Sequence, residues 1–344
     1  MTDVPPPPTP DRISTGPTTG STTAGDEAIR ERLLAVRQEV AKAVVGQDAA
    51  VSGLLVALLC GGHVLMEGVP GTAKTLLVRT LAASLSVETR RVQFTPDLMP
   101  GDITGSLVID TAAGRSGELS FREGPIFTNL LLADEINRTP PKTQSALLEA
   151  MEEGQVSADG VTRPLPRPFL VAATQNPVEF EGTYPLPEAQ LDRFLLKVIL
   201  PIPPRDDEVT ILSRHAGGFD PRDVAGAGVR SVASGADLEA GQEAVRRVQV
   251  APEVASYIVD IARATRQSPS LSLGVSPRGA TALLRAARAW AWLSGRDFVT
   301  PDDVKALAHS ALVHRLSLRP EAELEGVDVA QVLASAIGSV PVPR

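Results

Sequence analysis

A glycine-rich segment, Gly68 to Thr75 (GVPGTAKT), constrains the fold of this 344-residue chain more than any other feature. It follows a short apolar run and precedes a helical pattern, which is the context expected of a phosphate-binding loop. Such a loop needs backbone N–H groups that converge on phosphate oxygens at the positive end of a helix. We predict that Lys74 reaches the β- and γ-phosphates of a nucleotide and that Thr75 is a ligand of Mg²⁺. A strand–helix turn without a ligand is the alternative.

The residue before the lysine departs from the usual form of such loops, in which glycine stands at this position. Here it is Ala73. We expect alanine to be tolerated because the residue would already have a helical φ, which suits a side chain with a β-carbon. The predicted phosphate-binding residues are Gly68, Val69, Pro70, Gly71, Thr72, Ala73, Lys74 and Thr75.

Two adjacent carboxylates end a second apolar run, at Asp134 and Glu135. We predict that Asp134, at the tip of a buried strand, is the second protein ligand of Mg²⁺. Glu135 is predicted to polarise the water that attacks the γ-phosphate. A solvated turn with two acidic residues is the alternative, which the glycine-rich loop upstream disfavours.

Strand-like apolar runs recur through the first part of the chain, with helical patterns between them. They lie at 63–66, 90–94, 130–133, 169–173 and 195–200. This alternation predicts an α/β fold, a three-layer core with a parallel sheet. With the glycine-rich loop at 68–75, we expect this core to be of the P-loop NTPase type. For the helix at 139–153, Thr139 is expected to cap the start and Gly154 to mark the end.

After Pro204 the character changes: residues 215–237 are rich in Gly, Ala and Ser and are expected to form a loose connection. Beyond them the pattern is helical only, which predicts a small all-α domain after the sheet. Ser276-Pro277 and Thr300-Pro301 both combine a capping residue with proline, and therefore predict helix starts. We divide the chain into a disordered Pro/Thr-rich tail (1–25), a core (26–210), a linker (211–237) and an α-helical lid (238–338).

The composition excludes several classes of protein. The formal net charge of −8 argues against a general nucleic-acid binder, and 3% aromatic residues are too few for an extended base-stacking surface. A single cysteine excludes an internal disulfide framework and a cysteine-rich zinc site.

The uncharged run at 49–66 is the one candidate for a membrane span, and glycines with His63 interrupt it. We expect it to form a helix, a Gly-Gly turn and a strand, without direct insertion into a membrane. The first residues lack the basic and apolar regions of a signal peptide, so a cytoplasmic location is expected.

Over roughly residues 30–330 the chain resembles the MoxR family of AAA+ ATPases, in the clade with a helix-2 insert and a pre-sensor-1 hairpin. The matching segments are VGQ at 45–47, GVPGTAKT at 68–75, FTPDLMPGDITG at 94–105, FREGPIF at 121–127, LLLADEINRTPPKTQSALLEAMEEGQV at 130–156, ATQNP at 173–177, PLPEAQLDRF at 185–194 and GVSPRG at 274–279.

The resemblance implies roles for further residues. Asn176 matches the sensor-1 residue that orients the attacking water, and Arg278 matches the sensor-2 arginine aimed at the nucleotide. Arg193 matches the arginine finger that enters the site of a neighbouring subunit. Val45, Gly46 and Gln47 match the segment beside the adenine.

Each assignment keeps an alternative. Asn176 could be a turn residue at a strand end, Arg193 could pair locally with Glu188 or Asp192, and Arg278 could lie on a helix surface. Arg138, directly after the acidic pair, competes with Arg193 as the arginine that acts on a neighbouring subunit.

Two segments are additions to a minimal nucleotide-binding domain, and we predict that each forms a β-hairpin. They lie at 106–121 and 155–168. They resemble the helix-2 and pre-sensor-1 insertions, which in related rings face the pore or a partner. Simple connecting loops are the alternative.

As implied by the resemblance, the chain is an ATPase that hydrolyses ATP with Mg²⁺ in a homo-hexameric ring. Hydrolysis would drive chaperone-like remodelling or maturation of client proteins, together with a partner that contains a von Willebrand factor A domain. A P-loop kinase for a small molecule, a nucleotide-gated scaffold and a nucleic-acid motor are the alternatives.

Overall fold

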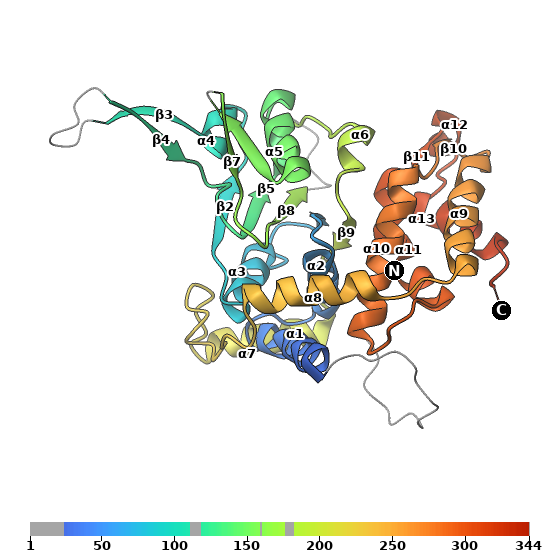
Figure 1. The fold of residues 1–344 in the computed structure, drawn as a ribbon, viewed down its shortest axis with the longest axis horizontal. Coiled ribbons are helices and arrows are strands. Elements are labelled where there is room, and N and C mark those ends of the chain that lie inside the picture. The colour runs from blue at the N-terminus through green and yellow to red at the C-terminus, as the bar shows by residue number, and fades with distance from the viewer. Residues whose placement is uncertain (1–23, 111–117, 159, 176–181, 344) are drawn as a thin grey trace.

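A five-stranded parallel sheet forms the centre of the computed structural model, which describes residues 24–110, 118–158, 160–175 and 182–343 (Figure 1). The strands lie in the order β2-β5-β8-β1-β9. Their bounds are β1 Val64–Glu67, β2 Thr89–Gln93, β5 Leu130–Asp134, β8 Leu170–Gln175 and β9 Leu196–Ile199. Each strand pairs in parallel with its neighbours. The predicted parallel sheet is therefore confirmed, and each strand overlaps its predicted run, although β2 (TRRVQ) is mostly polar.

Alternate residues of the strands face two separate cores, as expected for a sheet covered on both faces. In β5, Leu130 and Leu132 belong to one core, and Leu131 and Ala133 to the other. The first core is shared with α1 (Ala24–Ala43), α2 (Asp48–Cys60) and α3 (Lys74–Ser84). The second is shared with α4 (Pro100–Thr104) and α5 (Pro141–Glu153). Two helical layers therefore enclose the sheet.

The predicted hairpins are both present. β3 (Gly105–Asp110) pairs antiparallel with β4 (Glu118–Glu123), and β6 (Gln155–Ala158) pairs antiparallel with β7 (Val161–Pro164). Figure 1 shows the β3–β4 hairpin extending outward from the sheet. The guanidinium of Arg163 on β7 lies 3.7 Å from the ring centroid of Phe121 on β4, so the two hairpins touch.

The start of α5 differs from the prediction. The helix begins at Pro141 with Pro140 as its N-cap residue, not Thr139. Pro140 has φ −59° and ψ 153° because a residue before proline is forced out of the helical region. Thr139 therefore ends the preceding 3₁₀ helix η1 (Ile136–Arg138), and its buried hydroxyl has no hydrogen-bond partner among the described residues. The predicted end is confirmed, since Gly154 adopts a left-handed conformation with φ 63°.

The C-terminal part is almost entirely helical and lies beside the sheet-containing part (Figure 1). Its elements are α8 Gly235–Arg247, α9 Pro252–Gln267, α10 Pro277–Leu293, α11 Pro301–Leu312, η2 Val313–Arg315, α12 Pro320–Leu324 and α13 Val329–Ser339. A short antiparallel pair, β10 (Leu271–Leu273) with β11 (Ser317–Leu318), departs from the helix-only prediction. These strands are too short to produce a detectable alternation in the sequence.

The two capping predictions in this part are confirmed. The hydroxyl of Ser276 accepts a hydrogen bond from the N–H of Gly279 at 3.0 Å, and that of Thr300 accepts one from Asp303 at 3.3 Å. Helix α8 contacts α1, α2 and α10, and so joins the helical part to the core. The helices α6 (Glu188–Leu191) and α7 (Arg205–Ala216) lie before α8 in the chain. Within the described residues, no helix has both the length and the apolar character needed to cross a bilayer.

Candidate nucleotide-binding site

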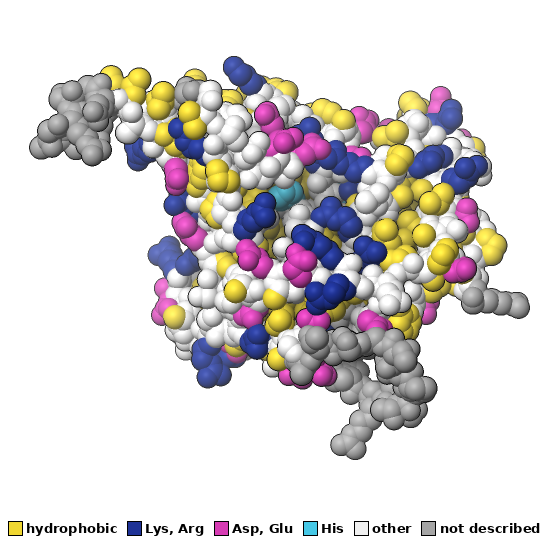
Figure 2. Space-filling view, in the orientation of Figure 1, with side chains coloured by type: hydrophobic (Ala, Val, Ile, Leu, Met, Phe, Trp, Pro, Cys, Tyr) yellow, Lys and Arg dark blue, Asp and Glu magenta, His cyan; other side chains and the backbone are white. Residues whose placement is uncertain are grey.

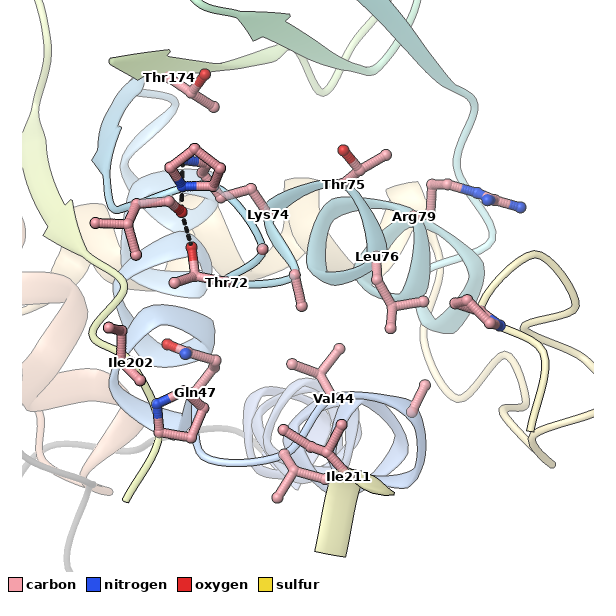
Figure 3. A pocket seen from close by; sticks show the side chains of 18 of the residues that line it. Val44, Gln47, Thr72, Lys74, Thr75, Leu76, Arg79, Thr174, Ile202 and Ile211 are labelled. Carbon is pink, nitrogen blue, oxygen red and sulfur yellow. Dashed lines mark hydrogen bonds between the residues drawn. The ribbon is translucent and has the colours of Figure 1, made fainter. Parts of the chain in front are cut away.

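A cavity of about 990 Å³ lies at the carboxyl edge of the sheet, between the glycine-rich loop, the end of α1 and helix α7 (Figure 3). The volume is at the upper end of the range for small-molecule sites. The predicted residues that line it are Val45, Gln47, Val69, Pro70, Gly71, Thr72, Ala73, Lys74, Thr75, Asp134 and Glu135. The loop follows β1 and the acidic pair follows β5, and parallel strands end at one edge, so both sets meet there.

Gly46 and Gly68 do not line the cavity. Their lack of a side chain allows other segments of the chain to pack closely against them. A β-carbon at Gly46, where φ is 73°, would lie 2.6 Å from a carboxylate oxygen of Asp207 in α7. A β-carbon at Gly68 would lie 2.7 Å from the carbonyl oxygen of Leu200. Gly71, with φ 88°, has open space where a β-carbon would stand.

Ala73 has an unexpected conformation. Its φ of 62° and ψ of 23° place it in the left-handed region, so the expected helical φ is wrong. The residue is the N-cap position of α3, where the loop reverses before the helix begins at Lys74. A left-handed conformation costs a residue with a β-carbon about 1–2 kcal/mol. This explains why glycine is the usual residue at this position.

Ala73→Gly is expected to stabilise the nucleotide-free protein by about 0.5 kcal/mol, because relief of the strain exceeds the extra entropy of the unfolded chain. Urea unfolding followed by circular dichroism measures the change. Ala83→Gly, at an exposed position of the same helix, is the control and should destabilise by about 0.5–1 kcal/mol. An equal loss of stability in both variants would contradict the left-handed conformation.

Lys74 is held against its own loop. Its Nζ donates hydrogen bonds to the carbonyl oxygens of Gly68 at 2.5 Å and Val69 at 3.4 Å. Partial burial lowers the pKa of Lys74, and the nearby carboxylates of Asp134 and Glu135 oppose that shift. The hydroxyl of Thr72 also donates to the carbonyl oxygen of Val69, at 2.9 Å (Figure 3). These bonds hold the loop and the ammonium group of Lys74 in one arrangement.

Asp134 is buried and carries hydrogen bonds on both carboxylate oxygens. Arg91 of β2 donates to Oδ2 from Nη2 at 2.8 Å and from Nε at 3.1 Å. The hydroxyl of Thr174, on β8, donates to Oδ1 at 2.6 Å. The carboxylate is therefore held in one orientation at the tip of β5.

Glu135 adopts a left-handed conformation with φ 59°, directly after β5. Its N–H donates to the hydroxyl of Thr174 at 2.9 Å. Oε2 accepts a hydrogen bond from Nε2 of Gln93 at 2.6 Å and lies 3.0 Å from Nε of Arg138. Oε1 has no hydrogen-bond partner in the described part of the chain. One carboxylate oxygen is thus anchored while the other is available to a water molecule.

Arg91, Gln93 and Thr174 were not found from the sequence. The two β2 residues are spaced by two and reach the acidic pair because β2 lies directly beside β5, with Gln93 opposite Asp134. The spacing is visible in the sequence. The adjacency of the two strands is not, because the β3–β4 hairpin separates them along the chain.

The donors around the loop fit Mg²⁺ bound together with a nucleotide. Thr75 and Asp134 offer a hydroxyl and a carboxylate, the hard oxygen ligands that Mg²⁺ prefers. Within the described residues no group of three His, Cys, Asp or Glu side chains could hold a metal ion. Mg²⁺ characteristically keeps waters and takes phosphate oxygens to complete its octahedron, and this donor set matches that habit.

The end of the cavity away from the glycine-rich loop is apolar. The sequence predicted only Val45 and Gln47 at this end. Its lining residues there include Val44, Ile202, Ile211, Leu212 and Phe219. The ring of His215 meets that of Phe219 edge to face, with centroids 5.3 Å apart. The amide of Gln47 donates to the carbonyl oxygen of Pro201 at 3.1 Å and fixes the adjoining turn. A flat apolar base fits this end, opposite the polar loop.

Arg193 and Arg278 do not line the cavity of their own chain. Both contact Glu152 in the last turn of α5: Nε of Arg193 lies 3.1 Å from Oε2, and Nη2 of Arg278 donates to Oε1. Arg138, by contrast, lies beside Glu135 of the same site. Asn176 lies outside the described residues. The catalytic roles of all four residues stay predictions.

The chain matches two family descriptions. Residues 63–196 match "ATPase family associated with various cellular activities (AAA)", and residues 263–336 match "AAA lid domain". A protein of Cytophaga hutchinsonii, solved by crystallography, superposes with a TM-score of 0.84 at 39% identity, covering 93% of this chain and 97% of that one.

Two relatives align over most of the chain. The protein YeaC of Bacillus subtilis (strain 168) is 47% identical over 306 residues, which cover 89% of this chain and 93% of YeaC. Chaperone MoxR1 of Mycobacterium tuberculosis is 42% identical over 315 residues, which cover 89% of this chain and 81% of MoxR1. Together with the parallel core and the helical lid, these matches place the chain in the MoxR family of AAA+ ATPases.

Proposed function

We propose that this chain hydrolyses ATP to ADP and phosphate as a subunit of a homo-hexameric ring, and that hydrolysis drives chaperone-like remodelling of client proteins. The convergence of Lys74, Thr75, Asp134 and Glu135 on one cavity carries the proposal for ATP hydrolysis. The name of the relative MoxR1, a chaperone, supports the second part.

Each residue of the cavity has a part in the proposed reaction. The backbone N–H groups of the loop and Lys74 hold the phosphates, while Thr75 and Asp134 hold Mg²⁺, which supplies charge neutralisation when bound. Glu135 accepts the proton of the attacking water at Oε1, the oxygen left available by Gln93 and Arg138. Asn176 is proposed to orient that water.

The position of two arginines supports the ring, because neither lines the cavity of its own chain. Arg193 and Arg278 share the carboxylate of Glu152. We assign both to the γ-phosphate of a neighbouring subunit, where guanidinium groups would stabilise the transferring phosphoryl group. A heterologous, head-to-tail interface generates a closed ring when its rotation closes.

The remaining assignments belong to the same proposal. The AAA+ core spans 26–210, the linker 211–237 and the lid 238–338, after a tail at 1–25. A protein with a von Willebrand factor A domain is the proposed partner, in the cytoplasm, with no nucleic acid and no direct membrane insertion.

Phosphate release by the purified chain, measured over a hundredfold range of protein concentration, tests the proposal. Activity per subunit is expected to rise steeply with concentration and then level off, because each site is completed by a neighbour. Mass photometry with ATP should show rings over the same range. Full activity of a monomer would overturn the proposal and favour a kinase-like enzyme with a self-contained site.

A further inference from the structure

The carboxylate of Glu152 stands between two guanidinium groups that come from different parts of the fold. Glu152 lies in the last turn of α5, Arg193 follows α6, and Arg278 lies in the first turn of α10. Oε2 faces Arg193 and Oε1 faces Arg278, so each carboxylate oxygen serves one arginine. Like charges repel, and a shared anion is what allows two arginines to stay side by side.

The geometry of these contacts leaves donors available on both arginines. Arg193 meets Glu152 through Nε at 3.1 Å, and neither of its Nη groups has a partner among the residues that the structure describes. Arg278 meets Glu152 through Nη2 and its side chain is 48% exposed. The two Nη groups of Arg193 can therefore both donate hydrogen bonds to an anion, in a bidentate arrangement.

The backbone around both arginines is fixed by their neighbours in the sequence. The hydroxyl of Ser276 donates to Oδ2 of Asp192 at 2.9 Å, and Nε of Arg315 donates to Oδ1 at 2.7 Å. Arg315 is 4% exposed and also donates to the carbonyl oxygens of Asp192 and Phe194. A β-carbon at Gly279 would lie 2.8 Å from Cδ of Arg315, so glycine is needed where α10 crosses it.

These bonds join the core to the lid at the point where the two arginines emerge. Figure 2 shows Lys and Arg side chains gathered over the middle of the face, between the sheet-containing part and the helices at the right. Resting on the function proposed above, we infer that Glu152 is a positioning residue. It holds Arg193 and Arg278 as one cationic pair that receives the γ-phosphate bound by the neighbouring subunit.

Glu152→Gln tests this role, because glutamine keeps the shape but removes the charge and one of the two acceptors. We expect kcat for ATP to fall about 10- to 100-fold, since misplaced catalytic groups lose rate at this scale. KM for ATP, and binding of a fluorescent ATP analogue, should stay within twofold because Glu152 touches no ligand. Glu153→Gln is the matched control: it is the next residue, is exposed, and has no ion pair within the described part of the chain.

A double variant separates positioning from a structural role. In an Arg193→Ala background, Glu152→Gln should lower kcat by less than threefold, because one of the residues it positions is already absent. Thermal unfolding and ring assembly of Glu152→Gln should match those of Glu153→Gln.

An unchanged or raised kcat in Glu152→Gln, with Arg193→Ala impaired, would overturn the inference and leave the proposed function standing. So would a loss of kcat that accompanies a loss of rings. An inactive wild-type protein would overturn the proposed function itself, and the inference with it.

Discussion

Glu135→Gln is expected to lower ATP turnover by at least about 10³-fold, because glutamine cannot accept the proton of the attacking water. ATP binding should persist, since the loop and Lys74, which would hold the phosphates, are hydrogen-bonded to each other and not to Glu135. The amide keeps the size of the side chain and can still accept a hydrogen bond from Gln93. The variant should therefore accumulate in the ATP-bound form and stabilise rings.

Phosphate release and binding of a fluorescent ATP analogue measure the two effects separately. Glu149→Gln, at an exposed position on α5 away from the cavity lining, is the matched control and should behave as wild type. Unchanged hydrolysis in Glu135→Gln would remove the catalytic assignment. The same variant, held with ATP, offers a stable form for capturing a client protein.

The features that the sequence could predict are those whose partners are close in the chain. The strands β1, β5, β8 and β9 are mainly apolar, whereas β2 (TRRVQ) is mostly polar. The loop at 68–75 is contiguous, so the loop and the four apolar strands follow from local pattern. The acidic pair could be placed beside the loop because parallel strands share one carboxyl edge. This much needs no knowledge of the strand order.

Contacts between distant segments could not be predicted. Arg91 reaches Asp134 only because β2 is the neighbour of β5, and Glu152 reaches Arg278 only because the lid lies beside α5. The apolar end of the cavity depends in the same way on α7, which packs near the end of α1 through bonds from Arg214 to the carbonyl oxygens of Ala41 and Lys42.

Two local predictions were wrong for local reasons. Thr139 does not cap α5 because Pro140, which precedes Pro141, has an extended backbone. Pro140 is therefore the N-cap residue, and the helix begins at Pro141. Ala73 is left-handed, although it has a β-carbon, because the loop must reverse before α3. The second case shows that a functional loop can hold a residue against its local preference.

Arg193→Ala is expected to lower kcat about 10³-fold with little change in ATP binding, the magnitude typical of an arginine supplied to a phosphoryl-transfer site. The reason is its position: Arg193 lies off the cavity of its own chain, which is the proposed site of nucleotide binding. Phosphate release, with nucleotide binding measured in parallel, checks both parts. Arg205→Ala is the control, because Arg205 is 85% exposed and lies outside the cavity lining.

Mixing inactive subunits tests whether the arginine acts on a neighbour. Lys74→Ala subunits lack a working phosphate site but carry Arg193, whereas Arg193→Ala subunits have an intact site and lack the arginine. In an equal, randomly assembled mixture, about a quarter of the head-to-tail interfaces would pair an intact site with an intact arginine. Activity should therefore return toward about that fraction of wild type, if the sites act independently. Activity that stays at the level of the separate variants, in rings shown to be mixed, would contradict the action of Arg193 on a neighbouring subunit.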